Sequence, residues 1–157
     1  MTDYAMMLKQ AEEMLKEEGW YVAAMSNLSA LIMENMADLN WAGFYLRRGE
    51  GLTVGPFQGK PACIHIPMGK GVCGTAALKD STIVVPDVHA FPGHIACDSA
   101  SRSEIVIPLH AAGQVVAVLD IDSPVPDRFS GKDREGLEQL VQLFQEKLGG
   151  LANAWEP

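Results

Sequence analysis

The sequence predicts an α+β fold in which an antiparallel sheet is covered on one face by helices from the two ends of the chain. Apolar residues recur at helical spacing near both termini, and the middle of the chain carries strand-like runs joined by short turns. This order of elements is typical of a layered α+β domain. The length fits one core, so residues 1–157 are expected to form a single domain. Long loops between residues 55 and 103 are expected to cover the other face and to carry the active site.

Two helices are expected before residue 40. The first spans residues 4–15, is expected to end at Gly19, and has one apolar face formed by Tyr4, Met7, Leu8, Ala11 and Leu15. That face could line a subunit interface or cover the sheet. The second helix spans residues 21–37 and is expected to lie deeper in the core, with one side formed by Leu28, Leu31, Ile32 and Met36.

After residue 40 the pattern changes to the period of two that strands have. Residues 41–48 (WAGFYLRR) and 51–57 (GLTVGPF) flank a turn and predict a hairpin. The expected core face of the first strand is Ala42, Phe44 and Leu46. Its other face carries Trp41 and Tyr45 with Gly43 between them, an arrangement that can form a wall for a small apolar or sulfur-containing group or can simply be covered by a loop.

Further strands and two helices are expected after this hairpin. Residues 63–67 (CIHIP) predict a short extended piece, residues 72–79 a short helix, and residues 81–88 (STIVVPDV) a strand. The clearest hairpin covers residues 104–123, with its turn at Ala112-Gly113. The last helix is expected to start after the N-cap Ser130, with Asp133 three residues on, and to end before Gly149-Gly150. Its apolar stripe is Leu137, Leu140, Val141, Phe144 and Leu148.

Charge and hydropathy argue against two classes of partner. The net charge of −8 opposes binding to a phosphate backbone, so nucleic acid is not an expected partner. No run of the chain approaches the roughly 20 apolar residues of a membrane span, so no membrane contact is expected. The N-terminus is acidic and helical rather than a secretory signal, and a cytoplasmic location is the expectation.

The three cysteines, Cys63, Cys73 and Cys97, lack the close pairing of structural zinc sites, although a ligand set could be completed on paper by His65, His89 or His94. They could also be buried structural residues, but all three fall in loop-rich sequence. A nucleophilic thiol needs nearby positive charge or hydrogen-bond donors. Cys97 meets this condition best, because His94 and Arg102 are close in sequence and donors are available from Ser99, Ser101 and Ser103.

Three carboxylates are expected near one another at the end of the second hairpin. Asp120 and Asp122 point to the same face of a strand, and Glu104 begins the partner strand. The register decides whether Glu104 shares that face, and the sequence leaves it open. The group could be a solvated strand end, a site for a divalent metal ion, or a site for the ammonium group of a ligand.

Three stretches closely resemble the free methionine-(R)-sulfoxide reductases, which are single-domain enzymes of the GAF fold. They are GPFQGKPACIHIPMGKGVCGTA (55–76), VPDVHAFPGHIACDSASRSEIVIPL (85–109) and GQVVAVLDIDSP (113–124), and the likeness extends over essentially the whole chain. The resemblance implies reduction of free methionine-(R)-sulfoxide to methionine, with thioredoxin as the reductant. It implies a GAF-like fold and favours a homodimer, and we expect neither a cofactor nor a metal ion.

The same resemblance implies roles for the candidate residues. Cys97 corresponds to the nucleophile, Cys63 to the main resolving cysteine, and Cys73 to a third thiol able to enter disulfide exchange. The aromatic residues Trp41 and Tyr45 correspond to those that enclose the methyl group of the substrate. The acids that bind the amino acid and assist at the sulfoxide oxygen correspond to Glu104, Asp120 and Asp122, and Glu104 is the preferred proton donor.

Two other classes of function fit the sequence less well. One fold hosts many functions, so a GAF-type sensor that binds a small molecule without acting on it is the main alternative. A structural or metal-binding protein that uses the cysteines and acids as ligands is the other.

Overall fold

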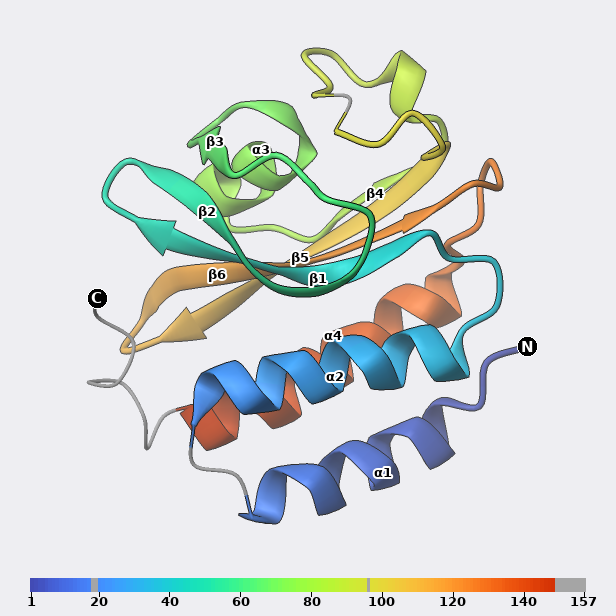
Figure 1. Cartoon of the computed structure of the whole chain (residues 1–157), viewed down its shortest axis with the longest axis vertical. Helices are drawn as coiled ribbons and strands as arrows, with labels where there is room; N and C mark the ends of the chain where they lie inside the picture. The colour runs from blue at the N-terminus through green and yellow to red at the C-terminus, as the bar shows by residue number, and fades with distance from the viewer. Residues whose placement is uncertain (18–19, 96, 149–157) are drawn as a thin grey trace.

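The computed structural model describes residues 1–17, 20–95 and 97–148, without the side chains at positions 17 and 148. Six strands form one antiparallel sheet in the order β3-β2-β1-β6-β5-β4. These strands are β1 (Trp41–Arg48), β2 (Gly51–Gly59), β3 (His65–Pro67), β4 (Ile83–Val85), β5 (Ser103–Ala111) and β6 (Gln114–Ser123). In Figure 1, α1 (Tyr4–Glu17), α2 (Tyr21–Asn35) and α4 (Gly131–Leu148) lie on one face, and α3 (Gly71–Lys79) lies on the other. The predicted α+β class is confirmed.

Two predicted strands are shorter in the structure than in the sequence pattern. The strand expected over residues 81–88 is reduced to β4 and ends before Pro86, which has no N–H to donate to a ladder. Of the extended piece expected over residues 63–67, only residues 65–67 form a strand, β3, which pairs with β2. Another proline, Pro108, is accommodated inside β5 because β4 pairs only with residues 104–106, so β5 has no second neighbour at that position.

The main core lies between the sheet and the three long helices. Strand residues that alternate toward the helices are buried there: Ala42, Phe44, Ile105, Ile107, Leu109, Ala117, Leu119 and Ile121. The predicted core face of β1 is therefore confirmed, as are four members of the α4 stripe, Leu137, Leu140, Val141 and Phe144. The apolar face of α1 covers this core rather than standing free, since Met7 is fully buried in it. The predicted helix end at Gly19, the side chain of Leu148 and the pair Gly149-Gly150 lie outside the described residues.

Local signals explain where α4 and the last hairpin begin. The Ser130 N–H donates to the Asp133 carboxylate at 2.9 Å and the Asp133 N–H donates to the Ser130 hydroxyl oxygen at 3.2 Å, which is the reciprocal pattern of a capping box. The hairpin of β5 and β6 closes between Ala111 and Gln114. Both turn residues have positive φ, 52° for Ala112 and 75° for Gly113, as a two-residue hairpin of the right twist requires.

The second face of the sheet is covered by the segment between residues 55 and 103, as expected, and the helix predicted within that segment is α3 (Figure 1). A second apolar cluster joins α3 to the sheet and includes Val72, Cys73, Ala76, Ala77, Val106 and Val118.

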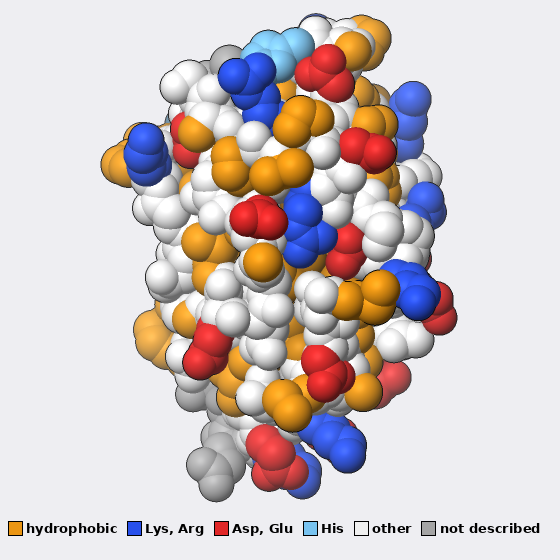
Figure 2. Space-filling view, turned by 90° about the vertical axis from the view of Figure 1, so that its right-hand side faces the viewer, with side chains coloured by type: hydrophobic (Ala, Val, Ile, Leu, Met, Phe, Trp, Pro, Cys, Tyr) orange, Lys and Arg blue, Asp and Glu red, His pale blue; other side chains and the backbone are white. Residues whose placement is uncertain are grey.

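No helix in the described part of the chain is long and apolar enough to cross a bilayer. Figure 2 shows the side of the molecule where acidic, basic and hydrophobic groups are interspersed over one surface.

Candidate active site

The register of three central strands places the predicted acids beside the predicted aromatic wall. Trp41 on β1 pairs with Asp122 on β6, which in turn pairs with Glu104 on β5. Two residues further along, Gly43 pairs with Asp120. Because side chains alternate along a strand, all of these positions point to the α3 face of the sheet. Glu104 therefore shares the face of both aspartates, which the sequence alone left open.

The acid group is buried, which contradicts the interpretation of a solvated strand end. Glu104 and Asp120 are each 6% exposed. Burial, followed by the negative charges of Asp120 and Asp122, raises the pKa of Glu104 well above its usual value. Burial, followed by the charge of Asp120, likewise raises the pKa of Asp122. These carboxyls therefore keep their protons to a higher pH than isolated carboxyls do, which suits them to donate a proton.

The aromatic residues form a closed wall rather than a pair over an open gap. The rings of Trp41 and Tyr45 stack with centroids 5.8 Å apart, and Trp41 also stacks on Phe57 at 5.0 Å. The space above Gly43 is taken by Phe57, whose Cβ occupies the position where a Cβ on residue 43 would be. Hydrogen bonds fix both site rings, because the indole N–H donates to the Lys60 carbonyl at 3.2 Å and the Tyr45 hydroxyl donates to the Cys63 carbonyl at 3.1 Å.

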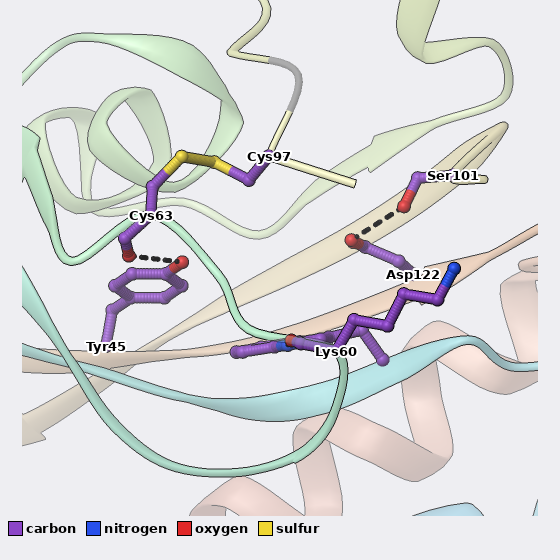
Figure 3. Close-up of a disulfide and its surroundings, with 7 residues drawn as sticks. Tyr45, Lys60, Cys63, Cys97, Ser101 and Asp122 are labelled. Atoms are coloured by element: carbon purple, nitrogen blue, oxygen red, sulfur yellow. Dashed lines mark hydrogen bonds between the residues drawn. A yellow bond between two sulfur atoms is a disulfide. The ribbon is translucent and has the colours of Figure 1, made fainter. Parts of the chain in front are cut away.

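A disulfide joins Cys63 to Cys97 above this wall (Figure 3), across a Cα–Cα distance of 5.5 Å. The two cysteines are 34 residues apart in sequence, on loops that approach the sheet from different directions. Cys97 lines the pocket that also contains Glu104, Asp120 and Asp122, whereas Cys63 does not line it. The structure thus brings the predicted nucleophile, the predicted resolving thiol and the predicted acids into one site.

Cys73 lies in the short helix expected over residues 72–79, which the structure confirms as α3. It belongs to the first turn of α3, is 4% exposed, and keeps a free thiol. Burial, followed by the negative charge of Asp120, raises the pKa of this thiol well above its usual value. Cys73 lines the same pocket as Cys97 but is held as a neutral thiol.

The loop that carries Cys97 is tied to the sheet by residues that the sequence did not single out. The Asn40 amide donates to the Asp98 carboxylate at 2.9 Å and to the Ser101 hydroxyl oxygen at 3.0 Å. The Ser101 hydroxyl in turn donates to Asp122 at 3.0 Å (Figure 3). Asn40 is 58 residues from Asp98, so no local pattern could have revealed this connection.

The positive charge expected near Cys97 comes from a different place. Arg102 is exposed and does not line the pocket. His94 does line the pocket, but burial lowers its pKa, so it is neutral at pH 7. Lys70 and the first turn of α3 border the pocket instead. The positive charge of Lys70 and the dipole at the N-terminal end of this helix favour the thiolate form of Cys97.

In this disulfide form the pocket has a cavity volume of about 40 Å³. One water needs roughly 10–15 Å³, so the cavity holds only a few waters and is too small for an amino acid. One group in the described part of the chain is suited to hold a cation: the sulfur of Cys73 and one carboxylate oxygen each of Glu104 and Asp120 all lie within 4.8 Å of one another.

Comparisons with known proteins agree with this geometry. The GAF domain family model matches residues 24–146 of the chain. The Free methionine-R-sulfoxide reductase of Escherichia coli (strain K12) is 48% identical over 145 residues, which cover 92% of this chain and 88% of the relative.

Two solved structures are similar over nearly the whole chain. The reduced form of fRMsr of Staphylococcus aureus superimposes with a TM-score of 0.92 at 49% identity, covering 94% of this chain and 96% of that one. The free methionine-R-sulfoxide reductase of Neisseria meningitidis in complex with its substrate has a TM-score of 0.92 at 40% identity, covering 96% and 91%.

Proposed function

The chain belongs to the GAF-domain family of free methionine-R-sulfoxide reductases, and on that premise we propose that it reduces free methionine-(R)-sulfoxide to methionine. The observation that carries the proposal is the pocket in which Cys97 meets a buried acid group and an aromatic wall. A sulfoxide needs a sulfur nucleophile, an acid at its oxygen and an apolar surface for its methyl group, and this pocket offers all three.

In the first step the thiolate of Cys97 attacks the sulfoxide sulfur while a carboxylic acid protonates the oxygen. The attack joins the Cys97 sulfur to the substrate sulfur. The protonated oxygen then moves to the Cys97 sulfur while the sulfur–sulfur bond and the substrate's sulfur–oxygen bond break, so methionine leaves with two more electrons and Cys97 is left as a sulfenic acid. Glu104 is the proposed proton donor and Asp122 the second choice, since both have a raised pKa. The substrate methyl group lies against Trp41 and Tyr45.

In the second step the Cys63 thiol condenses with the sulfenic acid, and water leaves as the Cys63–Cys97 disulfide forms. Thioredoxin is the proposed reductant that reopens this disulfide by thiolate exchange. Cys73 lines the same pocket and can take over the disulfide from Cys63, but its raised pKa makes it the slower thiol. The small cavity of the disulfide form means that sulfoxide enters only after reduction has freed the two loops.

Selectivity for the free amino acid follows from the charge of the pocket. Oδ1 of Asp120 and Oδ1 of Asp122 are buried, and no N–H or hydroxyl group in the described ranges donates to either of them. The α-ammonium group of free methionine sulfoxide supplies the missing donors, whereas a methionine residue within a protein chain has no such group. Leaving these oxygens unpaired costs about 1–3 kcal/mol for each group, so peptide-bound sulfoxide is rejected.

Further expectations complete the proposal. The disulfide chemistry fits a reducing cytoplasm, where thioredoxin keeps such thiols open. A homodimer is proposed from the family likeness and is open to measurement by analytical ultracentrifugation of the full chain.

The test follows thioredoxin-dependent NADPH consumption with each epimer of methionine sulfoxide, free and N-acetylated. Only the free (R)-epimer should be consumed. Cys97→Ser should abolish turnover, and Cys63→Ser should release one methionine per protein without recycling. Steady-state activity in the Cys97→Ser protein would refute the proposal.

A further inference from the structure

Cys73 offers a thiol that the proposed reaction does not need. Its sulfur lies in the first turn of α3, directly over the acid group of the sheet, and is 4% exposed. The sulfur and one carboxylate oxygen each of Glu104 and Asp120 lie within 4.8 Å of one another. A sulfur nucleophile and a resolving thiol are already supplied by Cys97 and Cys63, so this contact between a third thiol and two buried acids calls for a separate account.

The acids around Cys73 lack a cationic partner. All salt bridges among residues 1–17, 20–95 and 97–148 lie elsewhere in the fold, and none includes Glu104, Asp120 or Asp122. Asp120 is 6% exposed, and no N–H or hydroxyl group of the described residues donates to its Oδ1. The same holds for Oδ1 of Asp122 at the edge of the group. An unpaired buried carboxylate oxygen is costly, and a cation removes that cost.

We propose that Cys73, Glu104 and Asp120 form a binding site for one divalent thiophilic cation, Zn²⁺ in the first place, and that the bound cation excludes the amino-acid substrate. The donor set selects the ion, because a thiolate with two carboxylates suits Zn²⁺ or Co²⁺, whereas Mg²⁺ and Ca²⁺ prefer oxygen alone. Asp122, two residues further along β6 and on the same face, is the proposed fourth ligand.

The geometry requires a modest contraction. Zinc–sulfur and zinc–oxygen bonds of about 2.3 and 2.0–2.2 Å put tetrahedral ligand atoms roughly 3.5 Å apart. The ligand atoms lie within 4.8 Å of one another, so side-chain rotations need to bring them closer by at most roughly 1 Å. Glu104 and Cys73 belong to different elements, and both side chains have rotatable bonds for this movement.

The cation and the substrate compete because they use the same atoms. The exclusion of substrate rests on the function proposed above, in which Glu104 and Asp120 bind the amino acid, whereas the metal site itself does not depend on it. Binding also displaces protons, since a thiolate and carboxylates are the ligating forms.

The experiment uses the oxidised protein, in which the Cys63–Cys97 disulfide leaves Cys73 as the free thiol. Chelator-treated protein is titrated with Co²⁺, and the thiolate-to-cobalt absorption band is recorded; displacement of the band by Zn²⁺ gives the zinc affinity. One Co²⁺ per chain is expected. Cys73→Ser should remove the band and weaken zinc binding by about 10- to 100-fold or more. A loss of that size is typical when a residue that only hydrogen-bonds to a metal ligand is removed, and Cys73 is proposed as a ligand itself.

A matched control addresses surface binding. His89 and Asp87 form an exposed pair on the same half of the molecule, so His89→Ala should leave both the band and the zinc affinity unchanged. Asp120→Asn provides a second variant for the case in which Cys73→Ser does not fold. An unchanged band in Cys73→Ser, or unchanged zinc affinity in Asp120→Asn, would overturn the assignment of the ligands.

Competition is measured separately with the reduced protein and free methionine. A rise in the apparent zinc dissociation constant with methionine concentration supports the shared site, and a constant value overturns it. Metal binding without any turnover of methionine sulfoxide would instead identify a failure of the proposed function, because the cobalt titration does not require catalysis.

Discussion

Replacing Glu104 with Gln should stabilise the fold at neutral pH while removing most of the activity. Glu104 is buried beside Asp120 and Asp122 without a cationic side chain in contact, and this environment raises its pKa from an ordinary value of 4.5. A carboxyl with a raised pKa binds more protons in the folded than in the unfolded chain. Stability is therefore present below about pH 4.5 and is lost as pH rises toward the folded-state pKa.

The size of the change in the free energy of unfolding follows from the number of protons that the site retains on folding. Each additional proton held by the folded state makes the free energy of unfolding fall by about 1.4 kcal/mol per pH unit. Glu104 and Asp122 both have raised pKa values, and they titrate as one coupled group. Removing one titrating carboxyl should thus take away one proton's share of the slope, which amounts to at most about 3 kcal/mol between pH 5 and pH 7. Loss of the proton donor should lower kcat/KM by roughly 10²–10⁴.

Urea unfolding at pH 5, 6 and 7, with the disulfide intact, measures this difference directly. The slope of stability against pH should be smaller for Glu104→Gln than for the unaltered protein. Glu50→Gln is the matched control, because Glu50 is exposed in the turn between β1 and β2. Equal slopes in the Glu104→Gln and unaltered proteins would show that the acid group does not hold extra protons, and the assignment of Glu104 as donor would then lose its basis.

Three other predictions follow from the fold and the disulfide. Gly43→Ala should lower stability by about 1–3 kcal/mol in urea unfolding, because its Cβ would lie 2.7 Å from the Phe57 Cα; an unchanged midpoint contradicts this packing. Ala112→Asn should raise Tm by about 2–4 °C, because asparagine tolerates the φ of 52° better than alanine, and a lower Tm argues against the turn. A thioredoxin with one active-site cysteine should form a mixed disulfide with Cys63, because Cys63 lies outside the pocket and next to Ile64, which is 61% exposed. Peptide mapping that finds the mixed disulfide on Cys97 would refute this prediction.

Periodicity was sufficient to predict the layers, because alternation along β1 and the stripe of α4 reflect burial directly. The register of the last hairpin shows where this reasoning stops. Counted outward from the Ala111–Gln114 pair without interruption, Glu104 would lie opposite Ile121 and face the helices. The structure has a register shift between Leu109 and His110, which places Glu104 opposite Asp122 instead. One irregular residue therefore decides whether the third acid reaches the site.

The other features that the sequence did not predict also depend on contacts between residues distant along the chain. The cysteines, acids and aromatic residues were found from the sequence because their chemistry is distinctive. Asn40 was not, since its role depends on Asp98 and Ser101, which belong to a loop about 60 residues away. The helix that contains Cys73 was predicted over residues 72–79, but the burial of its thiol was not, because it depends on how Val72 and Ala76 pack α3 against the sheet.

The arrangement of the site also explains why a costly group of acids is tolerated in the middle of a sheet. Asp120 and Asp122 alternate along β6 with Leu119 and Ile121, which are buried against the helices. The core on the opposite face consequently fixes the backbone positions of the acids. The unfavourable free energy of burying the carboxyls arises on the other face, where the proposed ligand would bind. Cys63 and Cys97, by contrast, lie on loops, where the movement required to form and open a disulfide does not disturb that core. An acid group held by strands, with thiols held by loops, is the arrangement that the proposed cycle of substrate binding and disulfide exchange requires.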